Sequence, residues 1–459
     1  MTLHIRHPAA TDQRWNWLLD VVMTEWLGID HTREVTSESA VIFESEGAEL
    51  HIFNDFLIRT SGHAPSADHI PELPLARWTL PEELSHNIEN GILPVMFGTP
   101  QFTKVGDKAS LGLDVFGAVF FVLSRYEEVA SVRADQHDRF PGVESIAHRD
   151  GHLQRPIVDE YVEVLWNALR CVMPNLQRRL LKGKILISCD VDEPYERWIN
   201  SPLSLLKGIA GALIRRRSIK VAARRLLNAL SSWRGDFSHD PNWCFDWYMT
   251  ACEEHGHVAT FYFIPTTGRG GEDAAYQLDE PRIVDLMQNI LGRGHQIGMH
   301  GSYQSYRNPE LIASERAHLE RQIQSINPSS KVRENRQHFL RWRVEETPDH
   351  LQYAGFDVDA SGGFADQAGF RFGTSRQFRL WSWKKREGLN VMQSPLIVMD
   401  GTIASYMNLD LKTDGISLME KLMIRCIRYG GNFSMLWHNS NLDTNCQREV
   451  FLAALRIKW

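Results

Sequence analysis

Short apolar segments and amphipathic segments follow one another along the first part of the chain. Residues 41–45 and 50–57 alternate between apolar and polar side chains, which predicts two strands. Residues 114–129 are apolar on one face and predict a buried helix. Residues 157–173 predict a second, amphipathic helix that Pro174 ends. These elements, followed by a polar and basic junction, predict an N-terminal α+β domain over residues 1–178.

The pattern changes after this junction. Apolar segments at 184–194, 258–265, 295–302 and 432–440 predict strands, and residues 282–294 and 416–429 predict amphipathic helices. Alternation of strands and helices is typical of an α/β domain with a largely parallel sheet. We therefore expect such a domain over residues 179–459. Ligands of parallel sheets gather at the carboxyl ends of the strands, so polar residues that follow apolar segments are the first candidates for a site.

Residues 201–235 interrupt this alternation with a helical, amphipathic and strongly basic insertion. Two helices that meet near Arg215 would expose a positive face. Such a face would suit an anionic glycan, lipid headgroups or a protein partner. The alternative is an ordinary solvated helix pair whose apolar positions serve packing.

Length and composition narrow the classes of function. A chain of 459 residues exceeds what one hydrophobic core usually supports, and its net charge of -7 gives no footprint of nucleic-acid binding. We see neither a secretory signal nor a stretch long enough to span a bilayer. The six cysteines form no Cys-x-x-Cys pair, which is typical of reduced thiols. We expect a cytoplasmic protein without a transmembrane segment, in which residues 201–235 are the candidate for peripheral membrane contact, and we leave its oligomeric state open.

Two aspartates end the first apolar segment of the second domain. Asp190 and Asp192 are two positions apart, and in an extended strand such residues point to the same side. Two carboxylates would then face one spot, where one could bind a cation and the other could take a proton. The alternative is that both only shape the turn after the strand.

Basic residues follow other apolar segments. His300 enters a Gly–Ser loop, and neutral imidazole is a common metal ligand. His438 ends the segment FSMLW and could act as a general acid. For each, the alternative is a hydrogen-bonded structural histidine. The segment RQHFLRWR at 336–343 contains Arg336, His338 and Arg341. An arginine beside a catalytic carboxylate would keep it ionised, and the alternative is a solvated strand edge.

The order of these segments resembles the polysaccharide deacetylase family, also called the NodB-homology or carbohydrate esterase family 4 group. SCDVDEP at 188–194 is similar to its Thr-Phe-Asp-Asp-Gly motif, and VATFYF at 258–263 to its Ala-Thr-Phe-Phe strand. GHQIGMHGSYQS at 294–305 is similar to its Gly-His-Glu-Ile-Gly-x-His motif, and FSMLWHN at 433–439 to its last motif. The resemblance covers about residues 184–443.

The resemblance implies a fold and an activity. The fold is a distorted (β/α) barrel of about seven strands. The activity is metal-dependent hydrolysis of a non-peptide C–N bond, which removes an N-acetyl group from a sugar. It implies one divalent ion, zinc or a similar metal, held by Asp192, His300 and His338. Asp190 takes the place of the base and His438 that of the acid. Arg336, or alternatively Arg341, takes the place of the arginine, and Asp366 could orient Arg336 or His438.

Departures from the family pattern leave a second hypothesis open. The aspartates are spaced Asp-x-Asp rather than adjacent, and Gln304 stands where the family often has a second ligand histidine. Zinc prefers nitrogen or sulfur donors to an amide oxygen. The alternative function is therefore a degenerate deacetylase-like domain that serves as a glycan-binding or assembly module. A metal hydrolase that acts on an ester or cyclic amide is a third hypothesis.

Further segments resemble a subgroup of deacetylase-like proteins from bacterial surface-polysaccharide loci. In that subgroup the N-terminal domain resembles a companion domain of unassigned function. The resemblance implies a surface polysaccharide or its precursor as the carbohydrate substrate. It rests on residues 355–378 in the second domain and on residues 93–98, 114–128, 138–145 and 155–161 in the first.

Overall fold

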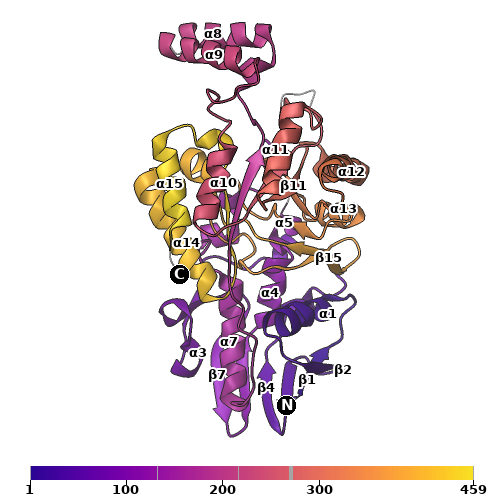
Figure 1. Cartoon of the computed structure of the whole chain (residues 1–459). Coiled ribbons are helices and arrows are strands. Elements are labelled where there is room, and N and C mark those ends of the chain that lie inside the picture. Colours follow the sequence, from indigo (N-terminus) through magenta and orange to yellow (C-terminus); the bar gives the residue numbers. More distant parts are fainter. Residues whose placement is uncertain (1, 132, 216, 268–271, 458–459) are drawn as a thin grey trace.

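The structure is a computed structural model that describes residues 2–131, 133–215, 217–267 and 272–457. Within these residues the chain forms a mixed α/β fold with sheets of six, nine and two strands. In Figure 1 the six-stranded sheet lies at the bottom, the nine-stranded sheet and its helices lie in the middle, and one helix pair stands apart at the top. The predicted division of the chain at residues 178 and 179 stays a prediction.

The N-terminal sheet has the strand order β2-β1-β3-β4-β8-β7. The predicted strand at 41–45 is confirmed, whereas 50–57 is not one strand, because β4 ends at Ile52 and helix α2 (Phe56–Arg59) follows. The Asp114 carboxylate accepts hydrogen bonds from the backbone N–H groups of Asp55 and Phe56 and so fixes the turn into α2. The strands are β1 (Leu3–Pro8), β2 (His31–Thr36), β3 (Val41–Ser45), β4 (Ala48–Ile52), β7 (Gly98–Val105) and β8 (Lys108–Leu113).

The helix predicted at 114–129 is interrupted. It consists of α4 (Val115–Leu123), buried along its whole length, and the short α5 (Tyr126–Ala130). Between them Arg125 has a left-handed φ of 54°. Its buried guanidinium pairs with Glu127 and Glu128, and these ion pairs compensate for its burial.

Helix α7 (Ile157–Val172) has the predicted length, but its polar face is not solvated. Its three acidic residues are buried, and each of them pairs with an arginine outside the helix. The pairs are Asp159 with Arg376, Glu160 with Arg155, and Glu163 with Arg178. Other ion pairs join the N-terminal part to the C-terminal part, namely Glu128 with Arg371, Glu89 with Arg425, and Asp138 with Arg343.

The nine-stranded sheet has the order β14-β15-β13-β12-β11-β10-β9-β17-β16. Its neighbours are parallel except for β14 and β15, as the strand–helix alternation predicts. Strands β14 and β16 are the two edges of this order. The strands are β9 (Ile185–Val191), β10 (Ala259–Phe263), β11 (Gln296–Gly301), β12 (Glu334–Gln337), β13 (Val358–Asp359), β14 (Phe378–Ser382), β15 (Glu387–Gln393), β16 (Val398–Met399) and β17 (Phe433–Leu436).

Helices connect these strands and pack around the sheet (Figure 1). The predicted helices at 282–294 and 416–429 are confirmed as α11 (Pro281–Gly292) and α14 (Ile416–Arg428). The others are α10 (Phe245–Glu254), α12 (Pro309–Ile326), α13 (Thr347–Tyr353) and α15 (Asn445–Leu455). The predicted helix pair in residues 201–235 is α8 (Pro202–Ile214) and α9 (Ile219–Ser232), which project from the body of the protein. Within the described residues, none of the helices combines the length and the apolar character that crossing a bilayer requires.

We expect the Asp114 carboxylate to stabilise the starts of the helices α2 and α4, which follow strands of the N-terminal sheet. Besides its two bonds to the α2 turn, it accepts a hydrogen bond from Gly117 N–H and so caps α4. Asp114→Ala would leave three backbone donors without this partner, and we expect it to lower the free energy of unfolding by about 2–4 kcal/mol. Asp55→Ala is the matched control, because Asp55 also precedes a helix but its side chain caps no backbone N–H. Denaturant unfolding of both variants measures the difference, and equal losses would contradict the capping role.

Candidate metal centre

The parallel strands bring the predicted site residues to one edge of the nine-stranded sheet. Asp190 lies near the end of β9, His300 near the end of β11, and Arg336 in β12. Asp192 follows β9 directly and His438 follows β17 by two residues. Carboxyl ends of parallel strands share one edge, so residues distant in sequence become neighbours there. A cavity of about 150 Å³ opens at this edge, lined by Asp190, Asp192, His300, His338 and His438 together with other residues.

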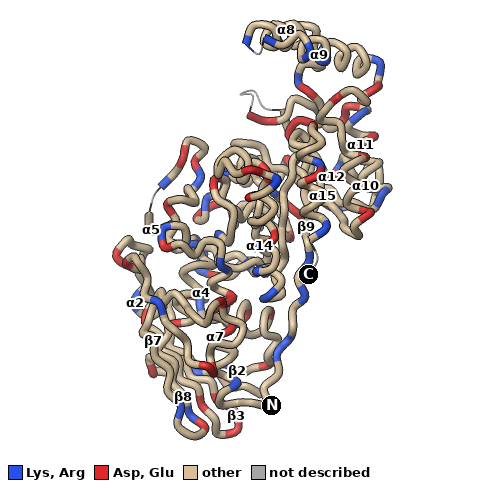
Figure 2. The backbone as a smooth tube through the Cα atoms, turned by 90° about the vertical axis from the view of Figure 1, so that its left-hand side faces the viewer, with Lys and Arg blue, Asp and Glu red and all other residues tan. Residues whose placement is uncertain are grey.

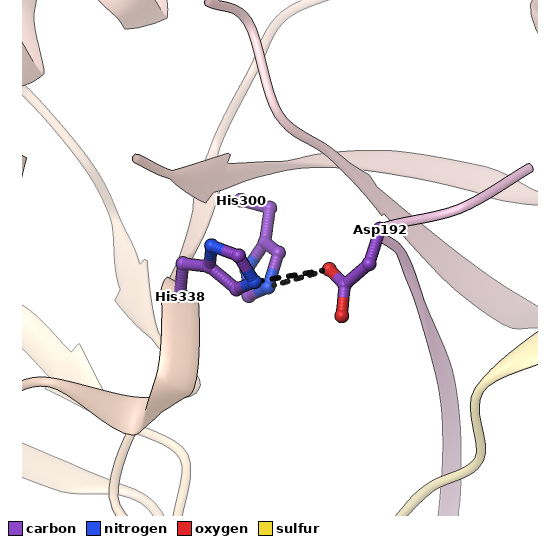
Figure 3. Close-up of side chains that lie close together, drawn as sticks. All are labelled: Asp192, His300 and His338. Carbon is purple, nitrogen blue, oxygen red and sulfur yellow. Dashed lines mark ion pairs between the residues drawn. The ribbon is translucent and has the colours of Figure 1, made fainter. Parts of the chain in front are cut away.

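Asp192, His300 and His338 form the one group within the described residues whose atoms could hold a metal ion. One ligand atom of each lies within 4.8 Å of the others. The Asp192 Oδ1 atom is 3.3 Å from His300 Nε2 and 3.5 Å from His338 Nε2. Figure 3 shows both imidazole rings directed at the Asp192 carboxylate. Two ligands of one tetrahedral zinc ion would be separated by about 3.3–3.6 Å, since each lies 2.0–2.2 Å from the ion. The two distances to Asp192 fit such a site.

The second ring nitrogen of each histidine has a hydrogen-bond partner. His300 Nδ1 lies 2.8 Å from the Arg336 carbonyl oxygen, which can only accept, so Nδ1 carries the proton. His338 Nδ1 lies 3.3 Å from a carboxylate oxygen of Asp273. In the neutral form of each ring, Nε2 then presents its lone pair to the centre. This arrangement is typical of histidines that bind a metal.

Asp192 Oδ1 supports the same conclusion. It is buried and accepts no hydrogen bond from any residue that the structure describes. A buried carboxylate oxygen without a donor costs free energy unless a cation or water satisfies it. Two imidazole lone pairs and one unsatisfied carboxylate oxygen together suit a divalent cation.

Charge in the centre shifts the pKa values of its members. Burial would raise the pKa of Asp192, but the neighbouring His338 and His300 outweigh this and hold it well below its usual range. Burial would lower the pKa of His338, but the Asp192 and Asp273 carboxylates raise it to about 9. Without a cation His338 is therefore protonated at neutral pH. Binding of a metal ion has to displace that proton.

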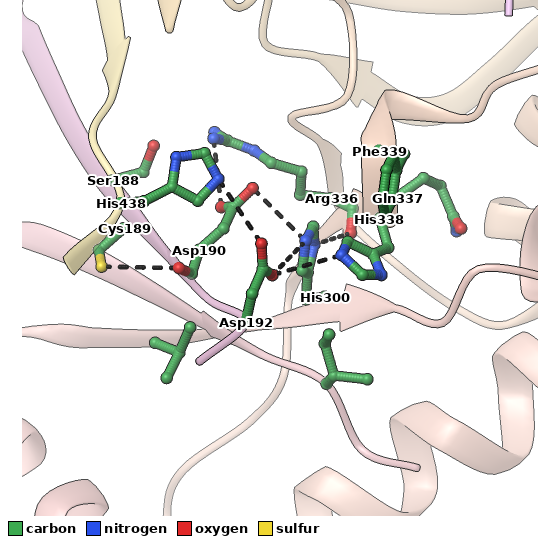
Figure 4. Close-up of polar contacts among 12 residues, drawn as sticks. Ser188, Cys189, Asp190, Asp192, His300, Arg336, Gln337, His338, Phe339 and His438 are labelled. Atoms are coloured by element: carbon green, nitrogen blue, oxygen red, sulfur yellow. Dashed lines mark hydrogen bonds and ion pairs between the residues drawn. The ribbon is translucent and has the colours of Figure 1, made fainter. Parts of the chain in front are cut away.

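Asp190 lies beside this group. One of its oxygens is 3.5 Å from His300 Nε2 and the other is 3.4 Å from Arg336 Nη1. Arg336 is itself buried, and its guanidinium lies over the Tyr262 ring, 4.7 Å from the centroid. Figure 4 shows Asp190 between Arg336, His438 and the group around Asp192. Of the two candidate arginines, Arg336 is thus the one that contacts Asp190, whereas Arg341 stacks on Tyr303 and Tyr306.

His438 reaches the cavity from the opposite side. Its Nε2 is 3.7 Å from Asp192 Oδ2, and its Nδ1 is 2.7 Å from Asp400 Oδ1. Burial would lower the pKa of His438, but Asp400 raises it to about 10. Asp400 also accepts a hydrogen bond from the His438 backbone N–H, so it fixes the ring and its charge.

The prediction that Asp366 orients Arg336 or His438 is wrong. The Asp366 carboxylate accepts hydrogen bonds from the backbone N–H groups of Gly142 and Val143 and so ties two parts of the chain together. Asp400 holds His438 instead. Asp400 follows the apolar residues 395–399 directly, in the same position after a strand as Asp192. That pattern could have identified it from the sequence.

Gln304, at the position where the family often has a ligand histidine, is not part of the group that could hold a metal ion. Gln304 is exposed and does not line the cavity. His338 is the third member of the group that could hold a metal ion. It begins a short turn, η7 (His338–Leu340), in which Phe339 and Leu340 have left-handed φ angles of 61° and 56°. Such angles in two bulky residues cost about 1–3 kcal/mol each and are typical of functional sites. These two strained residues directly follow His338, whose side chain lies in the candidate metal centre.

The N-terminal part of the chain also reaches the cavity. Arg139 lines it and donates hydrogen bonds to the Phe339 carbonyl oxygen and to the Tyr406 hydroxyl. The Asp135 carboxylate holds the Arg139 guanidinium at 2.7 Å. A larger cavity of about 630 Å³ lies at the amino ends of the strands, lined by Ile185, Thr260 and other residues. Among the described residues, the group that could hold a metal ion lines the smaller cavity and not this one.

Comparison with known proteins shows similarity to a protein family and to solved structures. Residues 3–174 match the family described as "Family of unknown function (DUF7033)". The chain is also similar to the crystal structure of a Mycobacterium smegmatis protein with the provisional name polysaccharide deacetylase, at 11% identity and a TM-score of 0.39. This similarity covers 60% of this chain and 83% of that chain. Among curated proteins none matches the chain.

Proposed function

We propose that the protein is a metal-dependent hydrolase that removes an N-acetyl group from a sugar. The observation that carries the proposal is the convergence of Asp192, His300 and His338, with Asp190 and His438 on either side, in one small cavity. The proposed domain is a distorted (β/α) barrel over residues 179–459. It follows an N-terminal domain over residues 1–178.

The cavity is smaller than most ligand sites. Its volume of about 150 Å³ lies below the roughly 300–1,000 Å³ that holds a whole small molecule. We propose that it takes the acyl group of the substrate, while the sugar ring stays at the mouth. A sugar in a surface polysaccharide or its precursor would suit a site that encloses only the reacting group.

Each side chain then has a separate role. A divalent ion, zinc in this proposal, held by Asp192, His300 and His338, would supply Lewis acidity to the acetamide carbonyl and to a water molecule. Asp190 takes a proton from the attacking water, and Arg336 positions Asp190 by donating a hydrogen bond to its carboxylate. The carbonyl C–N bond breaks, the water oxygen stays on the released acetate, and His438 gives its proton to the leaving amine. Asp400 positions His438 for this step.

The alternative of a degenerate binding module rests on Gln304 in the sequence. In the structure Gln304 is exposed and His338 fills the third position of the group, so this feature no longer favours loss of the metal. The third hypothesis, an ester or cyclic amide substrate, uses the same groups and differs only in what the cavity encloses.

Metal dependence tests the proposal directly. We expect the purified protein to release acetate from oligomers of N-acetylglucosamine or other N-acetylated sugars. Dialysis against a chelator should abolish this release, and added zinc or another divalent ion should restore it, because the ion supplies the Lewis acid. Acetate is measured by enzymatic assay and bound metal by mass spectrometry. A metal-free protein that binds such sugars without releasing acetate would instead establish the binding module.

A substitution of Arg139 tests whether the N-terminal domain contributes to substrate binding. We expect Arg139→Ala to raise KM by roughly tenfold or more while kcat changes less, because its guanidinium faces the cavity and would bind the sugar. Arg133→Ala is the matched control, since Arg133 lies in the same segment but pairs with Glu144 at the surface. Steady-state kinetics and metal content are measured for both. Loss of metal in Arg139→Ala would show that Arg139 instead supports the turn at Phe339.

A further inference from the structure

Helices α8 and α9 expose large aliphatic side chains and bury small or polar ones. Most of the buried positions are small or polar, and Leu205 is the one large aliphatic residue among them; they are Leu205, Gly208, Ala212, Ala222, Arg225, Asn228, Ala229 and Ser232. The exposed fractions are large for Leu206 (64%), Ile214 (75%), Ile219 (78%) and Leu227 (62%). A helix pair that only faced water would have the opposite arrangement.

The exposed residues of α9 form one continuous stripe. Their spacing of three and four residues places them on one face of the helix. The opposite face is fixed to the stem of the hairpin, where the Arg225 guanidinium lies over the Trp198 ring at 4.5 Å and Asn228 donates to Glu196 and Asp240. The stripe therefore cannot turn inward without breaking these contacts. It consists of Ile219, Leu226, Leu227, Leu230 and Trp233.

The charge of the hairpin identifies the kind of partner. Between residues 201 and 235 there is no aspartate or glutamate. Figure 2 shows the basic residues of the two helices at the far end of the molecule. The basic residues that the structure describes as exposed there are Lys207, Arg215, Arg217, Lys220, Arg224 and Arg234. Apolar side chains flanked by cationic ones, on helices that project from the body, are typical of segments that lie in an anionic membrane surface.

We infer that the α8–α9 hairpin docks the protein peripherally onto an anionic lipid bilayer. The leucines and isoleucines of the exposed stripe enter the interface, and the lysines and arginines contact the headgroups. A second copy of the chain is a poorer occupant, because two hairpins without acidic residues would repel each other. The hairpin follows β9, the strand that carries Asp190, by way of residues 192–200. Docking therefore holds the loop after Asp192 close to the membrane. The inference does not depend on the metal or on the reaction.

Vesicle sedimentation of the full-length protein tests the inference. We expect the protein to sediment with vesicles of phosphatidylcholine that contain phosphatidylglycerol, and far less with phosphatidylcholine alone. The variant Leu206→Ser/Ile214→Ser/Leu227→Ser should bind the anionic vesicles at least roughly tenfold more weakly, because it loses exposed apolar side chains from both helices of the hairpin. The variant Arg215→Gln/Arg217→Gln should bind roughly fivefold more weakly for each charge removed, and added salt should weaken the wild type.

Matched variants separate docking from general stickiness. Val105→Ser/Leu180→Ser removes two exposed apolar side chains (82% and 77% exposed) outside the hairpin and should leave vesicle binding unchanged. Thermal unfolding by circular dichroism should be the same for all variants, because every changed side chain is exposed. Absence of wild-type binding to both vesicle types, or equal binding of the triple variant and the wild type, would overturn the inference. So would light scattering that shows a wild-type dimer and a monomeric triple variant, since a second copy would then cover the stripe.

Discussion

Asp190→Asn is expected to lower kcat for acetate release by about 10²–10⁴-fold, the usual contribution of a general base. Asparagine has nearly the same size as aspartate but cannot take a proton from water. The Asp190 carboxylate is buried, accepts from Arg336 at 3.4 Å and lies 3.5 Å from His300, so the substitution removes a charge from the centre of the cavity. Because the proposed ligands are Asp192, His300 and His338, bound metal should stay at the wild-type level. Steady-state kinetics and metal analysis measure the two effects separately.

Asp366→Asn is the matched control for this prediction. Asp366 has the same side chain and lies in the same proposed domain, but it accepts hydrogen bonds from the backbone N–H groups of Gly142 and Val143 and does not line the cavity. We expect its kcat to remain within a few-fold of the wild type. Full activity of Asp190→Asn on a substrate that the wild type uses would remove Asp190 from the role of base. A large loss in Asp366→Asn with an unchanged unfolding temperature would return Asp366 to the site.

His338→Ala is expected to weaken metal binding by at least about 100-fold, since loss of a ligand costs more than the 10–100-fold typical of its hydrogen-bonded supports. His338 contributes one of the two imidazole nitrogens near Asp192 Oδ1, and alanine has no donor atom to replace it. Competition with a chromophoric chelator measures the dissociation constant for zinc without any substrate. The result therefore stays informative whatever bond the enzyme breaks.

Two further variants make the metal experiment specific. Gln304→Ala should bind zinc as the wild type does, because Gln304 is exposed and outside the cavity. Asp273→Asn should weaken binding less than His338→Ala, since Asp273 contacts the outer nitrogen of His338 and the Tyr303 backbone N–H and is not one of the proposed ligands. Wild-type affinity in His338→Ala would show that the third ligand is another group. A loss in Gln304→Ala equal to that in His338→Ala would contradict the geometry of the centre.

Elements with a strong local pattern are predictable from the sequence. The period of two in residues 41–45 predicts β3, and the period of 3.6 in residues 282–294 and 416–429 predicts α11 and α14. The pattern fails where a distant residue determines the backbone. Asp114 turns residues 55–56 into the start of a helix, and the buried ion pairs of Arg125 divide the helix predicted at 114–129.

The site residues that lie at or just after the end of an apolar strand were predictable from the sequence. Asp190, Asp192, His300 and His438 all have this position, and in a parallel sheet it implies a shared edge. Asp400 has it too and could have been included. Arg139 and Asp273 carry no such signal, because each lies in an irregular segment that only the folded chain brings to the cavity.

The sequence by itself determined the elements with a strong local pattern, the parallel character of the second sheet and the side-chain types available at its edge. These follow from local periodicity and from residue chemistry, which do not depend on distant neighbours. Only the tertiary structure decided that His338, proposed as a ligand from the sequence, lies beside Asp192 and His300. It also decided that Asp400 rather than Asp366 supports His438, and that the leucines of α8 and α9 other than Leu205 face outward. Each of these depends on which side chains meet in space. For residues in turns, or on helices with two apolar faces, the spacing along the chain does not determine which side chains meet.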